Sequence, residues 1–322
     1  MSKNVSKRKA GKLVEYTFEF PQKPEKKTFA QHIYDERDGK FFGRTRKSWL
    51  YLFIFYGVYF VVLISLFWLC MACLFATLSE DYPKYQLSDS LIGTNPGLGY
   101  RPMPEDIMRG AVVRYRAGNK NEMRYWTSRL DEFLEPYQNP SVLPGGGTNQ
   151  MSCEFGKLPE PGNVCAFDVD QFGPCSTANR YGYNESKPCI FLKLNRIYGW
   201  TPDFYDDIED LPKTMPADLV QHIRELPEHE RKQIWISCNG VFTGDQEAIG
   251  SLAYYPSRSI PPYHFPYTNT KGYLSPLVAV QFLNLKMRQN VFVECRAWAK
   301  NIIFKGGSRL RMGSVQFSML IE

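Results

Sequence analysis

A run of thirty residues from Trp49 to Leu78 carries no charged side chain. As an α-helix with about 1.5 Å of rise per residue, it would reach roughly 45 Å, whereas the hydrocarbon core of a bilayer is roughly 30 Å thick. The run is also longer than the roughly 7–15 apolar residues of a cleaved signal peptide, and 48 residues precede it. The sequence therefore predicts a transmembrane signal-anchor helix over residues 49–78.

Charged residues flank this run asymmetrically. Arg44, Arg46 and Lys47 come just before it, and Glu80 and Asp81 come just after it. Basic flanks stay on the cytoplasmic side of a membrane, so the N-terminus is expected inside the cell and the larger C-terminal part outside. We therefore expect a single-pass type II protein of the plasma membrane, with the lipid bilayer as its first partner.

The formal net charge of +6 belongs to the N-terminal tail. Residues 1–48 hold 13 basic and 6 acidic side chains, whereas residues 79–322 hold 26 basic and 27 acidic ones. A basic face for nucleic acid is therefore not expected, and no RNA- or DNA-binding motif accompanies the charge. We divide the chain into a cytoplasmic tail (1–48), the membrane helix (49–78), an extracellular stalk rich in Pro, Gly and Asp (79–105) and a disulfide-bonded ectodomain (106–322).

The eight cysteines separate into two groups. Cys70 and Cys73 lie in the apolar run, and six lie beyond it: Cys153, Cys165, Cys175, Cys189, Cys238 and Cys295. An even number in an extracytoplasmic domain predicts three disulfides, and six cysteines leave fifteen pairings open. None of the six forms a CxxC pair, and no His lies near them at ligand spacing, so we expect no bound metal.

Asn184-Glu185-Ser186 is an N-glycosylation sequon on the predicted extracellular side. A second sequon at Asn4 falls in the predicted cytoplasmic tail, where glycosylation does not occur. The sequence therefore predicts a glycan on Asn184 and none on Asn4.

The ectodomain shows one helical segment followed by strand patterns. Asn119 to Tyr137 has Asn119 as an N-cap with Glu122 three residues later, and its apolar side chains share one face: Trp126, Leu130, Phe133, Leu134 and Tyr137. Residues 234–238, 291–297 and 315–321 alternate apolar and polar side chains, the period of half-buried strands. The fold class expected is one transmembrane helix plus a mainly-β domain, an immunoglobulin-like sandwich with an added helix.

Cys238 and Cys295 both fall at inward positions of such strands. A bridge between them would pin the two sheets of a sandwich together, as in immunoglobulin-like domains.

Motifs for catalysis are scarce. HExxH, GxSxG, P-loop and GxGxxG patterns are absent from the sequence. The acidic cluster Asp206, Asp207, Glu209 and Asp210 fits no cation-binding loop and is interpreted as a solvated loop. We therefore expect no active site and no cofactor on this chain.

Two other protein classes share some of these features. Asp168-Val169-Asp170 is a DxD motif, which type II Golgi glycosyltransferases use to hold a metal and a sugar nucleotide. It lies between Cys165 and Cys175 without the helix–strand alternation of such enzymes, which argues against that class. A type II adhesion or junction glycoprotein would share the anchor, the disulfides and the glycan, and composition leaves that class open.

Several longer motifs resemble one family. They occur in the family's order from about Phe29 to the C-terminus: Phe41-Phe42-Gly43-Arg44-Thr45 with Ser48-Trp49, Phe55-Tyr56 with Tyr59-Phe60, Pro96-Gly97-Leu98, Tyr181-Gly182-Tyr183, Lys187-Pro188-Cys189, Leu194 to Trp200, Tyr254-Tyr255-Pro256, Tyr273 to Phe282, and Glu294-Cys295. The chain is similar to the β subunits of sodium/potassium- and proton/potassium-ATPases, and most closely to the sodium-pump β subunits of insects.

The resemblance implies an immunoglobulin-like ectodomain with consecutive disulfides, Cys153–Cys165, Cys175–Cys189 and Cys238–Cys295. It implies a non-catalytic subunit that assists the folding, membrane delivery and potassium affinity of a catalytic α subunit and so supports sodium export and potassium import. ATP, magnesium, sodium and potassium are then expected on α, and a small single-span regulatory subunit is a further expected partner. The loop Arg258–Thr270 is longer than in the vertebrate members, so no contact is carried over to it.

Contacts with α are expected both in the transmembrane helix and in the ectodomain. In the helix, Tyr56 and Phe60 share a face and Tyr59 and Leu63 form a neighbouring one, since residues four apart are neighbours on a helix. Outside the membrane, the block that resembles the family's YYP and YLxPL motifs supplies the expected contacts: Tyr254, Tyr255, Pro256, Tyr273, Leu274 and Pro276. The alternative for that block is the core of the domain itself.

Overall fold

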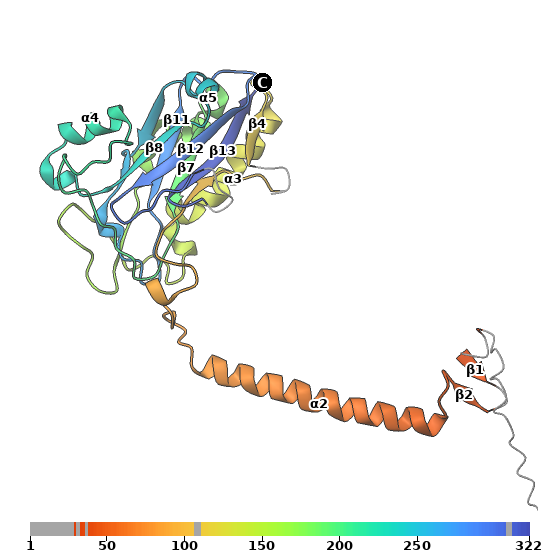
Figure 1. Ribbon diagram of the computed structural model, residues 1–322. Coiled ribbons are helices and arrows are strands. Elements are labelled where there is room, and N and C mark those ends of the chain that lie inside the picture. Colours follow the sequence, from red (N-terminus) through yellow and green to blue (C-terminus); the bar gives the residue numbers. More distant parts are fainter. Residues whose placement is uncertain (1–28, 30–32, 36–37, 106–110, 307–310) are drawn as a thin grey trace, which may run out of the picture. The chain divides into compact units, whose positions relative to one another are not determined.

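The computed structural model describes residues 29, 33–35, 38–105, 111–306 and 311–322 (Figure 1). They fall into two units that divide between Thr77 and Leu78. Most of the predicted cytoplasmic tail, including Asn4, lies outside the described residues. The first unit holds a two-stranded hairpin, β1 (Tyr34–Asp35) with β2 (Lys40–Phe41), and the long helix α2 (Arg46–Ala76).

Helix α2 is 31 residues long, and none of its residues is buried. It begins three residues before the predicted segment because Thr45 caps it, accepting a hydrogen bond from the backbone N–H of Ser48 at 3.4 Å. The indole N–H of Trp49 donates to the carbonyl of Phe41 at 2.8 Å and ties the first turn to the hairpin. An apolar helix exposed all round is long enough to cross a membrane and suits a lipid environment, which agrees with the predicted anchor.

The second unit contains most of the secondary structure. Its strands and helices are β3 (Leu98–Arg101), β4 (Val112–Tyr115), α3 (Lys120–Gln138), β5 (Gln150–Met151), β6 (Val164–Cys165), β7 (Cys189–Leu194), α4 (Ala217–Glu225), β8 (Ile234–Gly240), α5 (Thr243–Ala248), β9 (Leu252–Tyr255), β10 (Ser259–Ile260), β11 (Leu277–Phe282), β12 (Val291–Trp298) and β13 (Ser314–Ile321). Short 3-10 helices η1 (Leu87–Asp89), η3 (Pro140–Val142), η4 (Val169–Cys175), η5 (Thr177–Glu185), η6 (Glu228–Glu230) and η7 (Pro262–His264) fill the connections.

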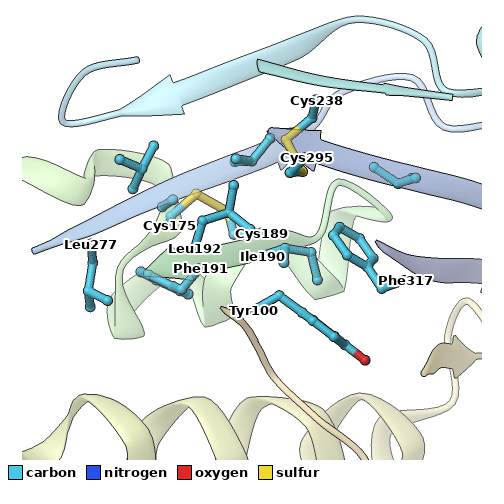
Figure 2. Close-up of a cluster of buried hydrophobic side chains, with 14 of the residues drawn as sticks. Tyr100, Cys175, Cys189, Ile190, Phe191, Leu192, Cys238, Leu277, Cys295 and Phe317 are labelled. Carbon is cyan, nitrogen blue, oxygen red and sulfur yellow. A yellow bond between two sulfur atoms is a disulfide. The ribbon is translucent and has the colours of Figure 1, made fainter. Parts of the chain in front are cut away.

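Two sheets form the body of this unit. One has the order β10-β8-β12-β13-β4, with β4 parallel to β13 and the other pairs antiparallel. The other has the antiparallel order β3-β7-β11-β9. The sheets share one core, in which the ring of Tyr100 on β3 stacks on Phe317 of β13 with centroids 4.8 Å apart (Figure 2). The expected combination of one apolar helix with a mainly-β domain is confirmed.

Helices cover the outer faces of the sheets. Under α4, Trp235 and Trp298 form a second apolar cluster with Leu219 and Ile223. On the other sheet, the outward-facing ring of Phe191 on β7 meets Phe172 of η4 at 5.0 Å and Tyr181 of η5 at 5.9 Å. Strand β7 is therefore buried on both faces, which explains why its residues 189–192 are all apolar and do not alternate with polar ones.

Helix α3 agrees with the predicted helical segment. Asn119 caps it by accepting hydrogen bonds from the backbone N–H groups of Asn121 and Glu122 at 3.2 and 3.4 Å. The predicted capping box is not formed, because the Glu122 carboxylate accepts from the backbone N–H of Arg116 at 2.7 Å instead of from that of Asn119. The predicted apolar face is buried except for Phe133, which is half-buried and packs against the core.

Two expectations about the ectodomain need correction. Cys238 and Cys295 are joined, but they lie directly opposite each other on the neighbouring strands β8 and β12, so their bridge staples one sheet instead of pinning two. The predicted stalk at 79–105 also contains β3, whose Leu98 and Tyr100 are buried in the core. Both errors have one cause: the strands that pair are distant in sequence, so their pairing cannot be read from local periodicity.

Candidate subunit interface

The aromatic residues predicted to contact α form a ridge on helix α2. The rings of Tyr56 and Phe60 stack with centroids 6.2 Å apart, and those of Phe55 and Tyr59 stack at 6.5 Å. All four rings are exposed, as is Leu63, which lies one helical turn beyond Tyr59. Phe55 was not among the predicted contacts, although its four-residue spacing from Tyr59 is a sequence signal that could have found it.

This ridge has the properties of a helix-packing surface in a membrane. Lipid tails are as apolar as side chains, so helices associate there through close van der Waals contact and not through the hydrophobic effect. Stacked rings present a rigid surface for such contact, and Gly57 beside Tyr56 has open space where a Cβ would lie. A small residue next to a ring lets a second backbone approach closely.

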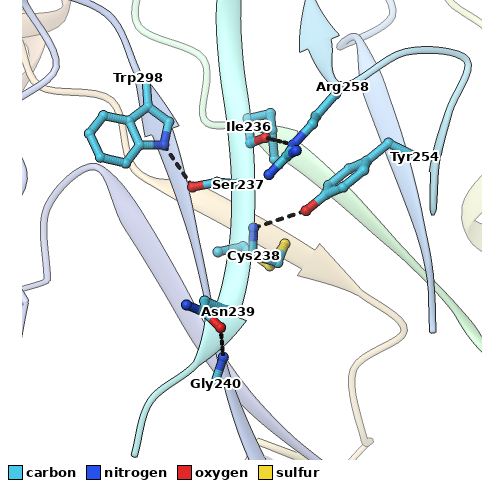
Figure 3. The surroundings of a disulfide bond; sticks show 9 residues. Ile236, Ser237, Cys238, Asn239, Gly240, Tyr254, Arg258 and Trp298 are labelled. Atoms are coloured by element: carbon cyan, nitrogen blue, oxygen red, sulfur yellow. Dashed lines mark hydrogen bonds between the residues drawn. A yellow bond between two sulfur atoms is a disulfide. The ribbon is translucent and has the colours of Figure 1, made fainter. Parts of the chain in front are cut away.

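In the second unit, Tyr254 of the predicted contact block serves the domain itself. Its hydroxyl oxygen accepts a hydrogen bond from the backbone N–H of Cys238 at 3.1 Å (Figure 3). The Arg258 guanidinium lies 4.8 Å from the centre of the Tyr254 ring and forms an ion pair with Asp218 at 2.7 Å. Burial raises the pKa of the Tyr254 phenol. Tyr254 therefore supports the strand that carries the Cys238–Cys295 bridge.

The other predicted contacts divide by exposure. Leu274 and Pro276 are buried within the domain, so their side chains are not available for contact with α. Pro256 is exposed, and Tyr255 and Tyr273 are half-buried at the surface. Tyr255 lies on β9, which forms one edge of its sheet; among the described residues, no strand pairs with the outer side of β9.

The long loop Arg258–Thr270 is structured by contacts with distant segments. The carbonyl of Tyr267 accepts a hydrogen bond from the backbone N–H of Gly199 at 2.8 Å, and the Asn269 amide donates to the carbonyl of Asp81 at 3.2 Å. His264 within this loop is buried, and desolvation lowers its pKa to about 4. The loop thus joins the start of the second unit to its core, a role for which its sequence carries no local signal.

Three disulfides link segments of the second unit. They join Cys153 to Cys165, Cys175 to Cys189 and Cys238 to Cys295, the consecutive pairs that the family resemblance implies. The second links η4 to β7, and the third links β8 to β12. Closing these loops restricts the unfolded chain and so favours a rigid domain.

The DxD motif and the acidic cluster 206–210 make local contacts within the second unit. Asp168 caps η4 by accepting a hydrogen bond from the backbone N–H of Asp170 at 3.0 Å. In the acidic cluster, Asp206 pairs with Lys232 and Lys300 at 3.4 Å, and Asp210 pairs with Lys300 at 3.2 Å. Within the described ranges, no group of three or more His, Cys, Asp or Glu side chains converges on a possible metal position.

Asn184 lies near the end of η5, and its side chain is exposed. The turn that follows it contains Ser186 in a left-handed conformation, and the neighbouring Tyr183 is fully buried. An exposed Asn beside a buried anchor is accessible to a bulky glycan without disturbing the core.

Comparison with known proteins places this arrangement in a family. Residues 20–317 match the family described as sodium/potassium ATPase β chain. The chain is 47% identical to the sodium/potassium-transporting ATPase subunit beta-1 of Drosophila melanogaster over 100% of both chains. It is 44% identical to the beta-2 subunit of the same species over 94% of both chains, and 31% identical to the human beta-2 subunit over 91% of this chain and 93% of that one.

Proposed function

The chain belongs to the sodium/potassium ATPase β chain family, and from this premise we propose that it is the non-catalytic β subunit of a sodium/potassium-transporting P-type ATPase. The observation that supports this function most directly is the exposed aromatic ridge on a single apolar helix. That ridge offers a second membrane protein a surface for packing. The glycosyltransferase and independent adhesion functions have no comparable support.

The proposed assembly has a defined topology. The N-terminus is cytoplasmic, α2 crosses the plasma membrane once, and the second unit is extracellular with a glycan on Asn184. The two facing sheets form an immunoglobulin-like sandwich in this proposal. ATP, magnesium, sodium and potassium act on the α subunit, and a small single-span subunit completes the complex.

In the membrane, Tyr56 and Phe60 pack against a helix of α, and Tyr59 and Leu63 extend the contact. Outside it, Tyr255, Pro256 and Tyr273 are the remaining contact candidates. A rigid domain that binds two conformations of α unequally shifts the equilibrium between them by its difference in binding free energy. This differential binding is the route by which a subunit without an active site changes the potassium affinity of the pump.

The test is capture of α by the full chain in detergent after double substitution of the ridge. Tyr56→Ala with Phe60→Ala removes both stacked rings, and we expect the yield of co-purified α to fall several-fold. The matched control is Ile54→Ala with Val61→Ala, which shortens two side chains on the opposite side of α2 by the 3.6-residue period. Retention of α by the ridge variant at the control level would reject the assignment of Tyr56 and Phe60.

A further inference from the structure

A cavity of about 920 Å³ in the second unit is lined by three cationic, two acidic and four aromatic side chains, among other residues. Phe133 and Tyr137 of α3 form one part of it, and Lys193 of β7 lies beside them. The connection after β7 contributes Arg196, and the segment 267–275 contributes further residues, among them Tyr267, Lys271 and Tyr273. The cavity therefore gathers three cationic side chains from two separate stretches of the chain.

Aromatic rings hold two of these cations in place. The Lys193 ammonium lies 6.0 Å from the centre of the Phe133 ring. The Arg196 guanidinium lies 5.3 Å from the ring centre of Tyr267 and 5.8 Å from that of Tyr273. Such contacts orient a cation while leaving its N–H groups free to donate.

The three cations of this cavity form no ion pair in the part of the chain that the structure describes. Arg258 and Lys300 elsewhere in the unit, in contrast, are paired with aspartates. Glu80 and Asp81 also line the cavity, but they pair with none of the three. Burial, followed by repulsion from Arg101 and Arg196, lowers the pKa of the half-buried Lys193. The three cations outnumber the two carboxylates of the lining, and this excess of positive charge favours an anion.

We propose that this cavity binds a phosphate-class oxyanion, with Lys193 and Arg196 as its principal ligands and Lys271 at its rim. Arg196 offers a planar fork of N–H donors that matches two phosphate oxygens, and Lys193 offers a point charge. Lys193 is half-buried beside Phe133 and Tyr137, and the lower local dielectric there strengthens its attraction to an anion. The same chemistry is presented by free phosphate and by the phosphodiester of a phospholipid headgroup.

The test uses the purified full chain in a phosphate-free, non-ionic detergent, titrated calorimetrically with inorganic phosphate and, separately, with glycerophosphocholine. We expect saturable binding of at least one probe and a loss of about tenfold or more in affinity for Lys193→Gln with Arg196→Gln, because charge-assisted hydrogen bonds are lost. The matched control is Lys213→Gln with Arg224→Gln, which removes the same two charges from exposed sites outside the cavity. Arg196→Gln alone changes only an exposed side chain and covers the case in which the double variant does not fold.

The two probes distinguish the sources of the anion. Tighter binding of glycerophosphocholine assigns the cavity to a lipid headgroup, and tighter binding of inorganic phosphate assigns it to the free ion. Absence of saturable binding by both probes overturns the proposal. Equal affinities of the wild type, the control and the Arg196→Gln variant also overturn it. Neither result bears on α binding, so the proposed pump function is tested separately.

Discussion

Acid should weaken the second unit through a single buried side chain, His264. This residue ends η7 in the long loop and is 7% exposed, and its ring lies 4.8 Å from that of Tyr263. Burial disfavours the imidazolium and lowers the pKa of His264 from 6.5 to about 4. In the unfolded chain the imidazole is hydrated and titrates near its ordinary pKa of about 6.5.

The sign follows from the protons bound in each state. Between these two pKa values the unfolded chain holds a proton on His264 and the folded chain does not, so the free energy of unfolding falls as the pH falls. The loss begins near pH 6.5 and is complete below the folded pKa of about 4. Relative to pH 7, the linkage relation gives a loss of about 2 kcal/mol at pH 5 and about 3 kcal/mol at pH 4 from this group.

The assay compares guanidinium unfolding of the full chain in detergent across this pH range, followed by tryptophan fluorescence. His264→Gln removes the titrating group. Between pH 7 and pH 5, the free energy of unfolding of this variant should therefore fall by about 2 kcal/mol less than that of the wild type. His229→Gln is the control, because the His229 side chain is 70% exposed. Parallel pH profiles for the wild type and His264→Gln would refute the reasoning, whatever the absolute stability of the variant.

Two further predictions concern the second unit. Asn184→Gln should remove one glycan, seen as a single mobility shift that enzymatic deglycosylation of the wild type reproduces. Asn4→Gln should cause no shift, and a shift from this variant would contradict the proposed orientation. Leu130→Ala on α3 should lower the free energy of unfolding by about 2–5 kcal/mol because Leu130 is fully buried. Glu132 is exposed, so Glu132→Ala should change that free energy by less than about 0.5 kcal/mol. Equal effects of the two substitutions would contradict the packing of α3.

Sequence periodicity predicts best those elements whose two faces differ. The helix after Asn119 and strands β12 and β13 each have one mainly apolar face, and their predicted bounds lie close to the observed ones. Strand β8 is also predicted, although Trp235 is buried on its other face. Strand β7 escapes such analysis because Ile190 and Phe191 are buried on opposite faces. Strand β3 is short and lies in a segment rich in Gly and Pro, so its buried Tyr100 is recognised only beside its partner Phe317.

Only the part of the candidate interface that depends on spacing along a single helix can be predicted from the sequence. The ridge of Tyr56 and Phe60 depends on helical spacing alone, and the sequence contains that spacing. Exposure in the second unit depends on which strands meet, so Leu274 and the exposed Pro256 could not be distinguished beforehand. The cluster of Lys193 and Arg196 arises from the same kind of distant contact, since the rings of Tyr267 and Tyr273 complete it.

The central claim is that this chain provides a surface and no chemistry of its own to an ion pump. Affinity capture of the full wild-type chain from detergent-solubilised membranes, followed by quantitative mass spectrometry, tests it most directly. The account predicts one P-type ATPase catalytic chain for each captured chain. Recovery of adhesion partners in place of a P-type ATPase would contradict it.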